Sequence, residues 1–190
     1  MKMLYLKIPH ERIPILVGTN GEVKREIEIK TGIRVLIDSE EGTVDLDETF
    51  AKDPLFALKV RDVVKAIARG FSPEKAMDII ELDLYFALVD IREYTGKKPK
   101  RIREMKGRMI GKEGKTKRII EQLGDCKLSI YGHTVAIIGD YVGIDISRTA
   151  VDMVLSGSKH ASVYGYLERK RREARTSKIE NIYEMDDDKL

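Results

Sequence analysis

Hydrophobic positions along the chain alternate between the spacing of helices and that of strands. Apolar residues three and four apart predict helices, and short apolar or alternating runs predict strands. The order strand, helix, helix, strand, strand, helix occurs twice. The predicted strands are Met3–Ile8, Ile33–Ile37, Val44–Leu46, Leu84–Ile91, Lys127–Tyr131 and Val135–Ile138.

Each half also contains three amphipathic stretches. The second of them ends at a glycine, Gly32 in one half and Gly124 in the other. We therefore predict an α+β fold in which each half packs a three-stranded antiparallel sheet on three helices and buries one sheet face. The apolar markers of the first and third helices are Ile13, Leu16, Val17 and Val60, Val63, Val64, Ile67 in one half, and Ile102, Met105, Met109 and Ile146, Ala150, Val151, Val154, Leu155 in the other.

The two halves repeat at an offset of 93 residues. This offset places Gly18-Thr19-Asn20-Gly21 on Gly111-Lys112-Glu113-Gly114, so that both segments read Gly-x-x-Gly. Several matches at one offset indicate a duplication. The other matches are Leu16-Val17 with Met109-Ile110, Lys24-Arg25 with Lys117-Arg118, and Ile27 with Ile120.

The pattern predicts three parts: a first domain at 1–75, a second at 76–160, and a basic helix with an acidic tail at 161–190. Ser72 is an expected N-cap of a short connecting helix. The last part is expected to be helical over Tyr164–Lys178, and Asp186–Asp188 to be a disordered acidic end.

Charge separates the halves. Residues 1–95 hold 14 Lys and Arg against 18 Asp and Glu, a net −4, whereas residues 96–190 hold 21 against 14, a net +7. The densest basic run is Lys97–Arg118, with eleven basic residues and two acids. A polyanion is therefore expected to bind the second half, although such runs are often only solvated faces.

Composition narrows the remaining classes. No run reaches the roughly 18 apolar residues of a membrane span, and no signal-peptide core is found, so we expect a cytoplasmic protein. Cys126 stands in an apolar run and is expected to be buried. His10, His133 and His160 are scattered, which predicts no metal and no cofactor. Many charges with few Asn and Gln indicate a thermophilic host.

The Gly-x-x-Gly segments have a chemical meaning because each lies between two predicted helices. Such a loop exposes unpaired backbone N–H groups, and the following helix adds its positive dipole end. Glycine lets a sugar–phosphate chain approach the backbone closely. Both segments resemble the KH family, whose loop clamps about four single-stranded nucleotides. The order of elements matches two tandem eukaryotic-type (type I) KH domains.

A closer resemblance rests on two further segments. Gly111–Lys117 and Ser162-Val163-Tyr164-Gly165 resemble the second KH region of the Pno/Dim-type ribosome-assembly factors of archaea and eukaryotes. The resemblance covers nearly the whole chain, up to about residue 175. It implies a non-catalytic protein that binds single-stranded rRNA near the 3′ end of the small subunit. The implied partners include the endonuclease that trims this end and other assembly factors.

In the second half, the amides of Gly111–Lys115 are expected on phosphate, with basic residues around them and an apolar floor below. Glu113 is expected to weaken the grip by charge repulsion. For the apolar residues a core role is equally compatible with the spacing, and Lys117 and Arg118 could be solvated. The predicted RNA-binding residues of this half are Arg108, Ile110, Gly111, Lys112, Glu113, Gly114, Lys115, Lys117, Arg118, Ile119 and Ile130.

In the first half, the predicted RNA-binding residues are Gly18, Thr19, Asn20, Gly21, Lys24 and Arg25. The uncharged loop leaves two alternatives for this half: weak RNA binding, or contact with protein. The basic tail with Arg169, Lys170, Arg171, Arg172 and Arg175 is either an RNA-binding or a solvated helix.

Three other functions bear on these residues: nucleotide binding, catalysis and an adaptor role. Gly114-Lys115-Thr116 resembles the end of a nucleotide-binding P-loop, but that motif requires glycine where Met109 stands. No catalytic set of residues is found, which predicts that the protein is not an enzyme. A KH adaptor of RNA decay or translation, with the first half contacting protein, is the alternative function.

Overall fold

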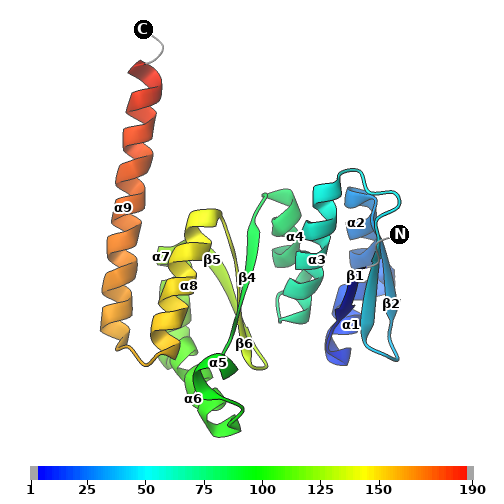
Figure 1. The fold of residues 1–190 in the computed structure, drawn as a ribbon, viewed down its shortest axis with the longest axis horizontal. Coiled ribbons are helices and arrows are strands. Elements are labelled where there is room, and N and C mark those ends of the chain that lie inside the picture. The colour runs from blue at the N-terminus through cyan, green and yellow to red at the C-terminus, as the bar shows by residue number, and fades with distance from the viewer. Residues whose placement is uncertain (1–3, 188–190) are drawn as a thin grey trace.

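The structure is a computed structural model that describes residues 4–187. It contains two three-stranded antiparallel sheets, each accompanied by helices (Figure 1). The first unit follows the predicted order of elements and adds one helix. Its elements are β1 (Leu4–Lys7), α1 (Ile13–Val17), α2 (Glu22–Thr31), β2 (Arg34–Asp38), β3 (Thr43–Asp47), α3 (Pro54–Ala68) and α4 (Pro73–Glu81).

The second unit repeats this order and again ends with an additional helix. One short helix, α5, was not expected from the hydrophobic pattern, because a single turn is too short to show a helical period. The elements are β4 (Tyr85–Asp90), α5 (Arg92–Thr95), α6 (Pro99–Ile110), α7 (Lys115–Gly124), β5 (Cys126–Tyr131), β6 (Thr134–Gly139), α8 (Tyr141–Leu155) and α9 (His160–Asp187).

Both sheets place the last strand of the unit in the middle. The strand orders are β1-β3-β2 and β4-β6-β5, and every pair is antiparallel. In each hairpin, apolar residues face each other on the helix side, such as Val35 opposite Leu46 and Ile130 opposite Val135. The predicted antiparallel sheets are therefore confirmed.

The ends of four helices show what the local sequence specifies. Asp53 and Asp140 cap α3 and α8, each accepting a hydrogen bond from a first-turn amide. Ser72 occupies the N-cap position of α4 without a side-chain cap bond to the helix. Gly32 ends α2 in the left-handed conformation as expected, with φ of 77°.

The helix α7 ends at Gly124 as predicted, but this glycine is not the left-handed residue that follows the helix. Asp125 takes the left-handed position with φ of 50°, and Gly124 is the last helical residue. A Cβ on Gly124 would lie 2.1 Å from Oγ of Ser147 on α8. Glycine is needed here because α8 packs closely against α7, and not because the chain turns.

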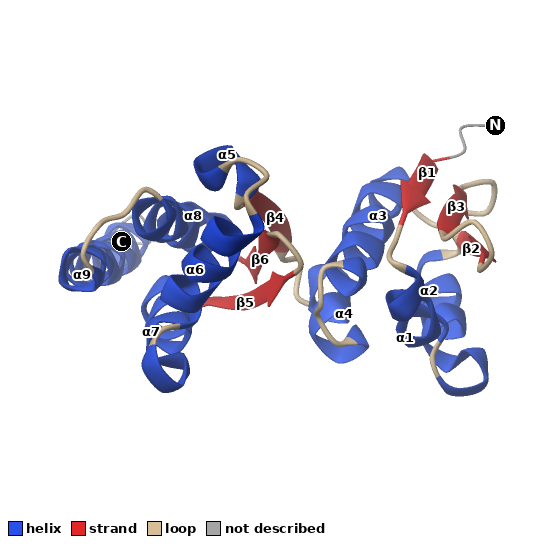
Figure 2. Cartoon of the chain, turned by 90° about the horizontal axis from the view of Figure 1, so that it is seen from below, coloured by secondary structure: helices blue, strands red, loops and turns tan. Residues whose placement is uncertain are grey.

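The expectation that each sheet buries only one face is wrong for the second sheet. Every residue of β6 is buried, and Ala136 and Ile138 belong to the same apolar cluster as Met77 and Ile79 of α4. Figure 2 shows the second sheet between its own helices and the α3–α4 pair of the first unit. A strand buried on both faces has the continuous apolar sequence seen at Val135–Ile138.

The last helix is longer than the expected Tyr164–Lys178. It packs on α7 and α8 through the fully buried Val163 and Leu167, and then extends past the rest of the molecule (Figure 1). Its backbone continues to Asp187, which corrects the expected disorder of Asp186 and Asp187, whereas Asp188 lies outside the described residues.

Candidate nucleic-acid interface

The two glycine loops follow the same backbone path. Gly18 has φ of 74° and ψ of 177°, and Gly111 has φ of 73° and ψ of 175°. This region of backbone space is accessible almost only to glycine. The third loop residue, Asn20 or Glu113, has φ of 53° in both copies. The repeat detected in the sequence is therefore also a repeat of conformation.

The two glycines of a loop have different reasons to be glycine. A Cβ on Gly111 would lie 2.3 Å from Oγ1 and 2.8 Å from the backbone N of Thr116, and a Cβ on Gly18 would lie 2.8 Å from the backbone N of Val23. The missing side chain at the first glycine thus lets the next helix lie close to the loop. Around a Cβ on Gly114 nothing lies within 4 Å, so this position keeps the outer surface of the loop open.

The helices that follow the loops begin without a side-chain cap. Gly21 and Gly114 are the N-cap residues of α2 and α7, and neither helix receives a side-chain capping bond. The first N–H groups of a helix have no partner within the helix, and the helix dipole favours an anion beside them. In the second loop the amides of Gly114 and Lys115 already donate to the carbonyls of Gly111 and Lys112. The positive end of the helix dipole is therefore what both helix starts offer to a phosphate.

Charge distinguishes the second loop. Lys112 and Lys115 are exposed, and no ion pair involves either of them among the residues that the structure describes. Lys115 stands in the first turn of α7, where a cation is opposed by the helix dipole at a cost of roughly 0.3–1 kcal/mol. A lysine here weakens the helix slightly, but it suits a bound anion.

Further along α7, two more predicted residues have defined contacts. Nη2 of Arg118 donates to the backbone carbonyl of Glu113 at 3.0 Å, which holds the guanidinium beside the loop. Nζ of Lys117 lies 3.7 Å from the Glu121 carboxylate. Glu113 itself is exposed, so its carboxylate is free to turn away from a phosphate.

The first loop has the opposite charge at its helix start. Glu22 occupies the position that matches Lys115, and the helix dipole interacts favourably with an acid there. Thr19 and Asn20 are exposed and uncharged, and Lys24 lies 3.9 Å from the Glu28 carboxylate. Arg25 is exposed. The first loop thus has the same backbone but a weaker attraction for an anion.

Arg108 has a structural contact. Its Nη2 donates to the carbonyl of Ser158 at 2.6 Å, in the turn between α8 and α9. A nitrogen of His160 in turn contacts the Arg108 carbonyl at 3.1 Å. The side chain ties α6 to the start of α9, and an RNA contact by Arg108 stays a prediction.

Of the three residues expected to form an apolar floor, Ile110 is the exposed one, at 40%. Ile119 and Ile130 are half-buried and pack against the core of the second unit. Ile110 lines a cavity of about 550 Å³ that we call the α6 groove, between α6 and the turn joining β5 to β6. Its lining residues are Pro99, Ile102, Arg103, Lys106, Gly107, Ile110, Gly132 and His133.

Sequence reasoning did not single out Arg103 and Lys106 in this groove. They lie on one face of α6 with Ile102 and Ile110, at spacings of three and four residues. That spacing, read together with the glycine loop, could have identified them. His133, which the sequence did not mark as a binding residue, closes the groove on the other side.

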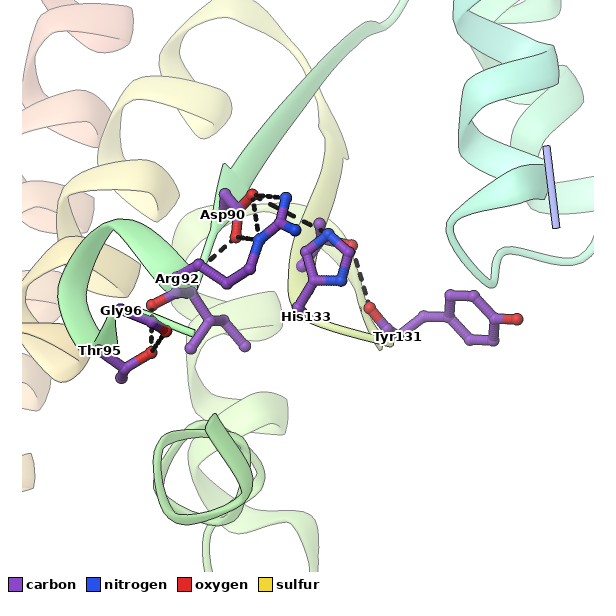
Figure 3. Close-up of polar contacts among 8 residues, drawn as sticks. Asp90, Arg92, Thr95, Gly96, Tyr131 and His133 are labelled. Atoms are coloured by element: carbon purple, nitrogen blue, oxygen red, sulfur yellow. Dashed lines mark hydrogen bonds and ion pairs between the residues drawn. The ribbon is translucent and has the colours of Figure 1, made fainter. Parts of the chain in front are cut away.

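The His133 ring stands near the ion pair of Asp90 and Arg92 (Figure 3). The guanidinium of Arg92 contacts the Asp90 carboxylate at 2.6–3.0 Å, and Nε2 of His133 lies 3.9 Å from the same carboxylate. Burial lowers the pKa of His133, the Arg92 and Arg69 guanidinium groups lower it further, and Asp90 opposes them. The imidazole is therefore neutral at neutral pH.

The start of α9 is attached to the second loop. The Tyr164 hydroxyl and Oγ1 of Thr116, in the first turn of α7, lie 2.9 Å apart. Further on, Arg169 and Arg172 are exposed, and Lys170 pairs with Glu173 at 2.7 Å. The basic residues of α9 thus belong to the same unit as the α6 groove.

Other chemistry has little support in the described part of the chain. No group of three or more His, Cys, Asp or Glu side chains there could hold a metal ion, and no helix within residues 4–187 has the length and apolar composition to cross a membrane. Burial raises the pKa of Cys126 to about 12, and its sulfur accepts a hydrogen bond from Ser147. The thiol is therefore protonated and unreactive.

Comparison with known proteins agrees with this geometry. Residues 85–172 match the family model of the eukaryotic-type KH domain (KH-domain type I). The second unit is therefore a type I KH domain, a class that binds single-stranded nucleic acid through a glycine loop.

Two curated relatives extend the comparison. A KH domain-containing protein of Methanocaldococcus jannaschii is 43% identical over 92% of this chain and 77% of its own length. The pre-rRNA-processing protein PNO1 of Yarrowia lipolytica is 34% identical over 57% of this chain, and the match spans less than half, 43%, of that protein.

Two crystal structures from Pyrococcus horikoshii are similar in sequence and fold. Dim2p is 42% identical, with a TM-score of 0.81 over 89% of this chain and 99% of that one. A chain of the a/eIF2alpha–aDim2p–rRNA complex is 40% identical, with a TM-score of 0.84 over 90% and 95%. This chain belongs to the Pno/Dim-type family of KH-domain ribosome-assembly factors.

Proposed function

We propose that this protein binds single-stranded rRNA near the 3′ end of the small ribosomal subunit during its maturation, mainly through the Gly111–Gly114 loop. The first unit is a second KH domain in this proposal, so that the chain is a tandem of two. The role is one of binding and positioning, without catalysis, in the cytoplasm. The rRNA 3′-end endonuclease and other assembly factors are the proposed partners.

The observation that carries the proposal is the start of α7. Its first amides have no side-chain cap, Gly114 leaves the surface before them open, and Lys115 stands in the first turn against the helix dipole. Without a ligand this arrangement destabilises α7, and a phosphate bound beside the helix start would offset that cost.

The α6 groove supports single-stranded RNA as the ligand. Ile102 and Ile110 give it an apolar surface for a base, and Arg103 and Lys106 stand at its rim for the flanking phosphates. A base can enter such a groove only when it is unstacked and unpaired, which favours single strands over duplexes.

The first unit supports a second candidate function. Its loop is uncharged and is followed by Glu22, so its affinity for RNA alone is expected to be low. In the alternative, this unit contacts protein, and the chain is a KH adaptor of RNA decay or translation. Under this alternative the second unit alone accounts for RNA binding.

The test is a titration of fluorescent single-stranded RNA with the rRNA 3′-end sequence, using the intact protein and two matched variants. Lys112→Asp places an acid on the second loop, and Thr19→Asp does so at the same position of the first. We expect about a tenfold loss of affinity for Lys112→Asp and less than about threefold for Thr19→Asp, because the second loop holds more phosphate contacts.

Equal affinity of all three proteins would contradict the proposal, and so would equal binding of a duplex. A single strand of unrelated sequence, bound as tightly as the 3′-end sequence, would remove the rRNA assignment but keep the loop. Substituting Gly111 by Asp is a poorer test, because any Cβ there collides with Thr116 and lowers stability.

A further inference from the structure

The outer face of β5 is held by the first unit. The β5 strand forms the edge of the second sheet, and its outward residues alternate with those of the core. Lys127 forms an ion pair with Asp78 of α4, and Oγ of Ser129 donates to the carbonyl of Arg69 at 2.8 Å. At the end of the strand, the Tyr131 hydroxyl donates to the Glu11 carboxylate.

Tyr131 contacts the first unit at several points. The Arg12 guanidinium lies 5.8 Å from the centre of the Tyr131 ring. A Cβ on Gly70 would come within 2.9 Å of Cβ of Tyr131, so the backbone after α3 approaches this residue closely. The phenol is thus fixed at its hydroxyl, at its ring and at its base.

Arg12 is itself held by the end of α3. Its Nε donates to the carbonyl of Ile67 at 2.7 Å, and its Nη2 to the carbonyl of Phe71 at 2.5 Å. Both carbonyls lie at or just after the C-terminal end of α3, where the helix dipole favours a cation, and the Ile67 carbonyl also accepts from the amide of Gly70 at 3.1 Å. The guanidinium therefore presents a fixed surface to Tyr131, and its position does not depend on solvent.

Tyr131 directly precedes the turn that forms one wall of the α6 groove. Oγ1 of Thr134 donates to the Tyr131 carbonyl at 3.0 Å, and the His133 carbonyl accepts from the amide of Ile91 at 2.9 Å. Figure 3 shows Tyr131 pointing toward the first unit while His133 faces the Asp90–Arg92 pair. A shift of Tyr131 would move Gly132 and His133, and with them the width of the groove.

We infer that the first unit acts as a positioning element for the RNA groove of the second, with Glu11 and Arg12 acting through Tyr131. Neither residue lines the groove, so both are positioning residues and not RNA contacts. A preformed groove spares RNA the cost of ordering the turn on binding. This inference rests on the proposed function of the α6 groove.

The first unit offers a comparison within the same molecule. The matching outward residues of β2, which are Arg34, Leu36 and Asp38, are all exposed. The edge strand of the first unit therefore has no such support among the described residues. The supported groove belongs to the unit that also holds the basic loop.

The experiment uses the full chain and an RNA of about four nucleotides, which a single KH groove can hold. Glu11→Ala, Tyr131→Phe and the double variant form a cycle, since Glu11→Ala removes the acceptor and Tyr131→Phe removes only the hydroxyl. We expect each single variant to lower RNA affinity about fivefold, mainly through faster dissociation, and the double variant to match the singles. The NMR signals of the His133 imidazole are expected to shift in all three.

The matched control is Lys127→Gln, which removes a contact with the first unit from the same face of β5, far from the turn. It is expected to leave RNA affinity within about twofold, because it does not bear on Gly132 and His133. A general effect of loosening the two units would lower affinity equally in Lys127→Gln and Tyr131→Phe, and this outcome would overturn the inference.

Lys112→Asp in the same assay separates the inference from the proposed function. Loss of binding in Lys112→Asp, with unchanged binding in the whole Glu11–Tyr131 cycle, would sink the positioning role alone. Unchanged binding in Lys112→Asp would sink the proposed function and the inference with it.

Discussion

The Gly18–Gly21 and Gly111–Gly114 loops have nearly identical backbone angles, but their surroundings differ in charge and in support. Lys115 follows the second loop where Glu22 follows the first. The edge strand beside the second loop is held by the first unit, whereas the strand beside the first loop is exposed. A duplicated backbone thus preserves the fold of a binding loop, and its function depends on side chains that the backbone does not fix.

The largest expected effect concerns what the two loops share. Replacing Gly111 or Gly18 by Ala should lower the free energy of unfolding by about 2–4 kcal/mol. The backbone conformation there is accessible almost only to glycine, and the new Cβ would collide with the next helix. Replacing Gly114 or Gly21 should cost only about 1 kcal/mol, since only the left-handed conformation opposes it. Urea unfolding measures both. A Gly111→Ala variant as stable as Gly114→Ala would contradict the explanation.

The next effect concerns what distinguishes the loops. Lys115→Glu should lower RNA affinity about tenfold and yet stabilise α7 by roughly 0.5 kcal/mol, because the helix dipole interacts favourably with an acid in the first turn. Glu22→Lys should act in the opposite direction on both quantities in the first unit.

Titrations at several salt concentrations and thermal unfolding measure this pair of variants. Opposite signs of the two effects are the diagnostic result, since ordinary misfolding lowers stability and affinity together. A Lys115→Glu variant that loses stability as well as affinity would count against a role of Lys115 in binding phosphate.

A smaller effect is expected from α9. Changing both Arg172 and Arg175 to Gln should weaken RNA binding about twofold to fourfold and flatten its salt dependence, because fewer counterions are released. The melting temperature should not change, since both side chains are exposed. Lys170→Gln, at a residue already paired with Glu173, is the control. If all these proteins had the same salt dependence, α9 would be a solvated helix and not an RNA-binding one.

Deleting the chain after Ser162 would not test the same point. Val163 and Leu167 are fully buried against α7 and α8, and Tyr164 contacts Thr116 beside the loop. Their removal would expose the core of the second unit, so that lost binding would have two causes.

The smallest effect concerns the turn beside the second loop. Because the folded-state pKa of His133 lies below its ordinary value of 6.5, protonation favours the unfolded chain. The neutral ring therefore contributes stability above pH 6.5 that is lost as the pH falls through the folded pKa. His133→Gln should lose less stability than the parent on acidification. Unfolding measured from neutral to mildly acidic pH checks this, and parallel curves would contradict it.

Much of the fold could be predicted from the sequence because the information is local. Apolar spacing gave the strands and helices of both units, and the offset of 93 aligned two loops whose angles agree within a few degrees. The single-turn helix Arg92–Thr95 and the left-handed cap of α7 at Asp125 were not predicted, because one turn shows no period and Gly124 is glycine for packing.

The candidate site was only partly predictable. The loop residues and Lys115, Lys117 and Arg118 stand together in the sequence and also in space. Arg103, Lys106 and His133 join them only because α6 and the β5–β6 turn face one groove, which no local pattern encodes. Arg108 was assigned to RNA from its place before the loop, but the fold directs its side chain to Ser158.

By itself the sequence determined the two repeated units, the glycine loops and the unequal charge of the halves, because each depends on neighbouring residues or on composition. The tertiary structure decided which faces meet. The edge strands β2 and β5 alternate in the same way, but the outer face is exposed in β2 and covered in β5, since only the second sheet has the first unit packed against it. Contacts between residues far apart in the chain, such as Glu11 with Tyr131, arise only from that packing.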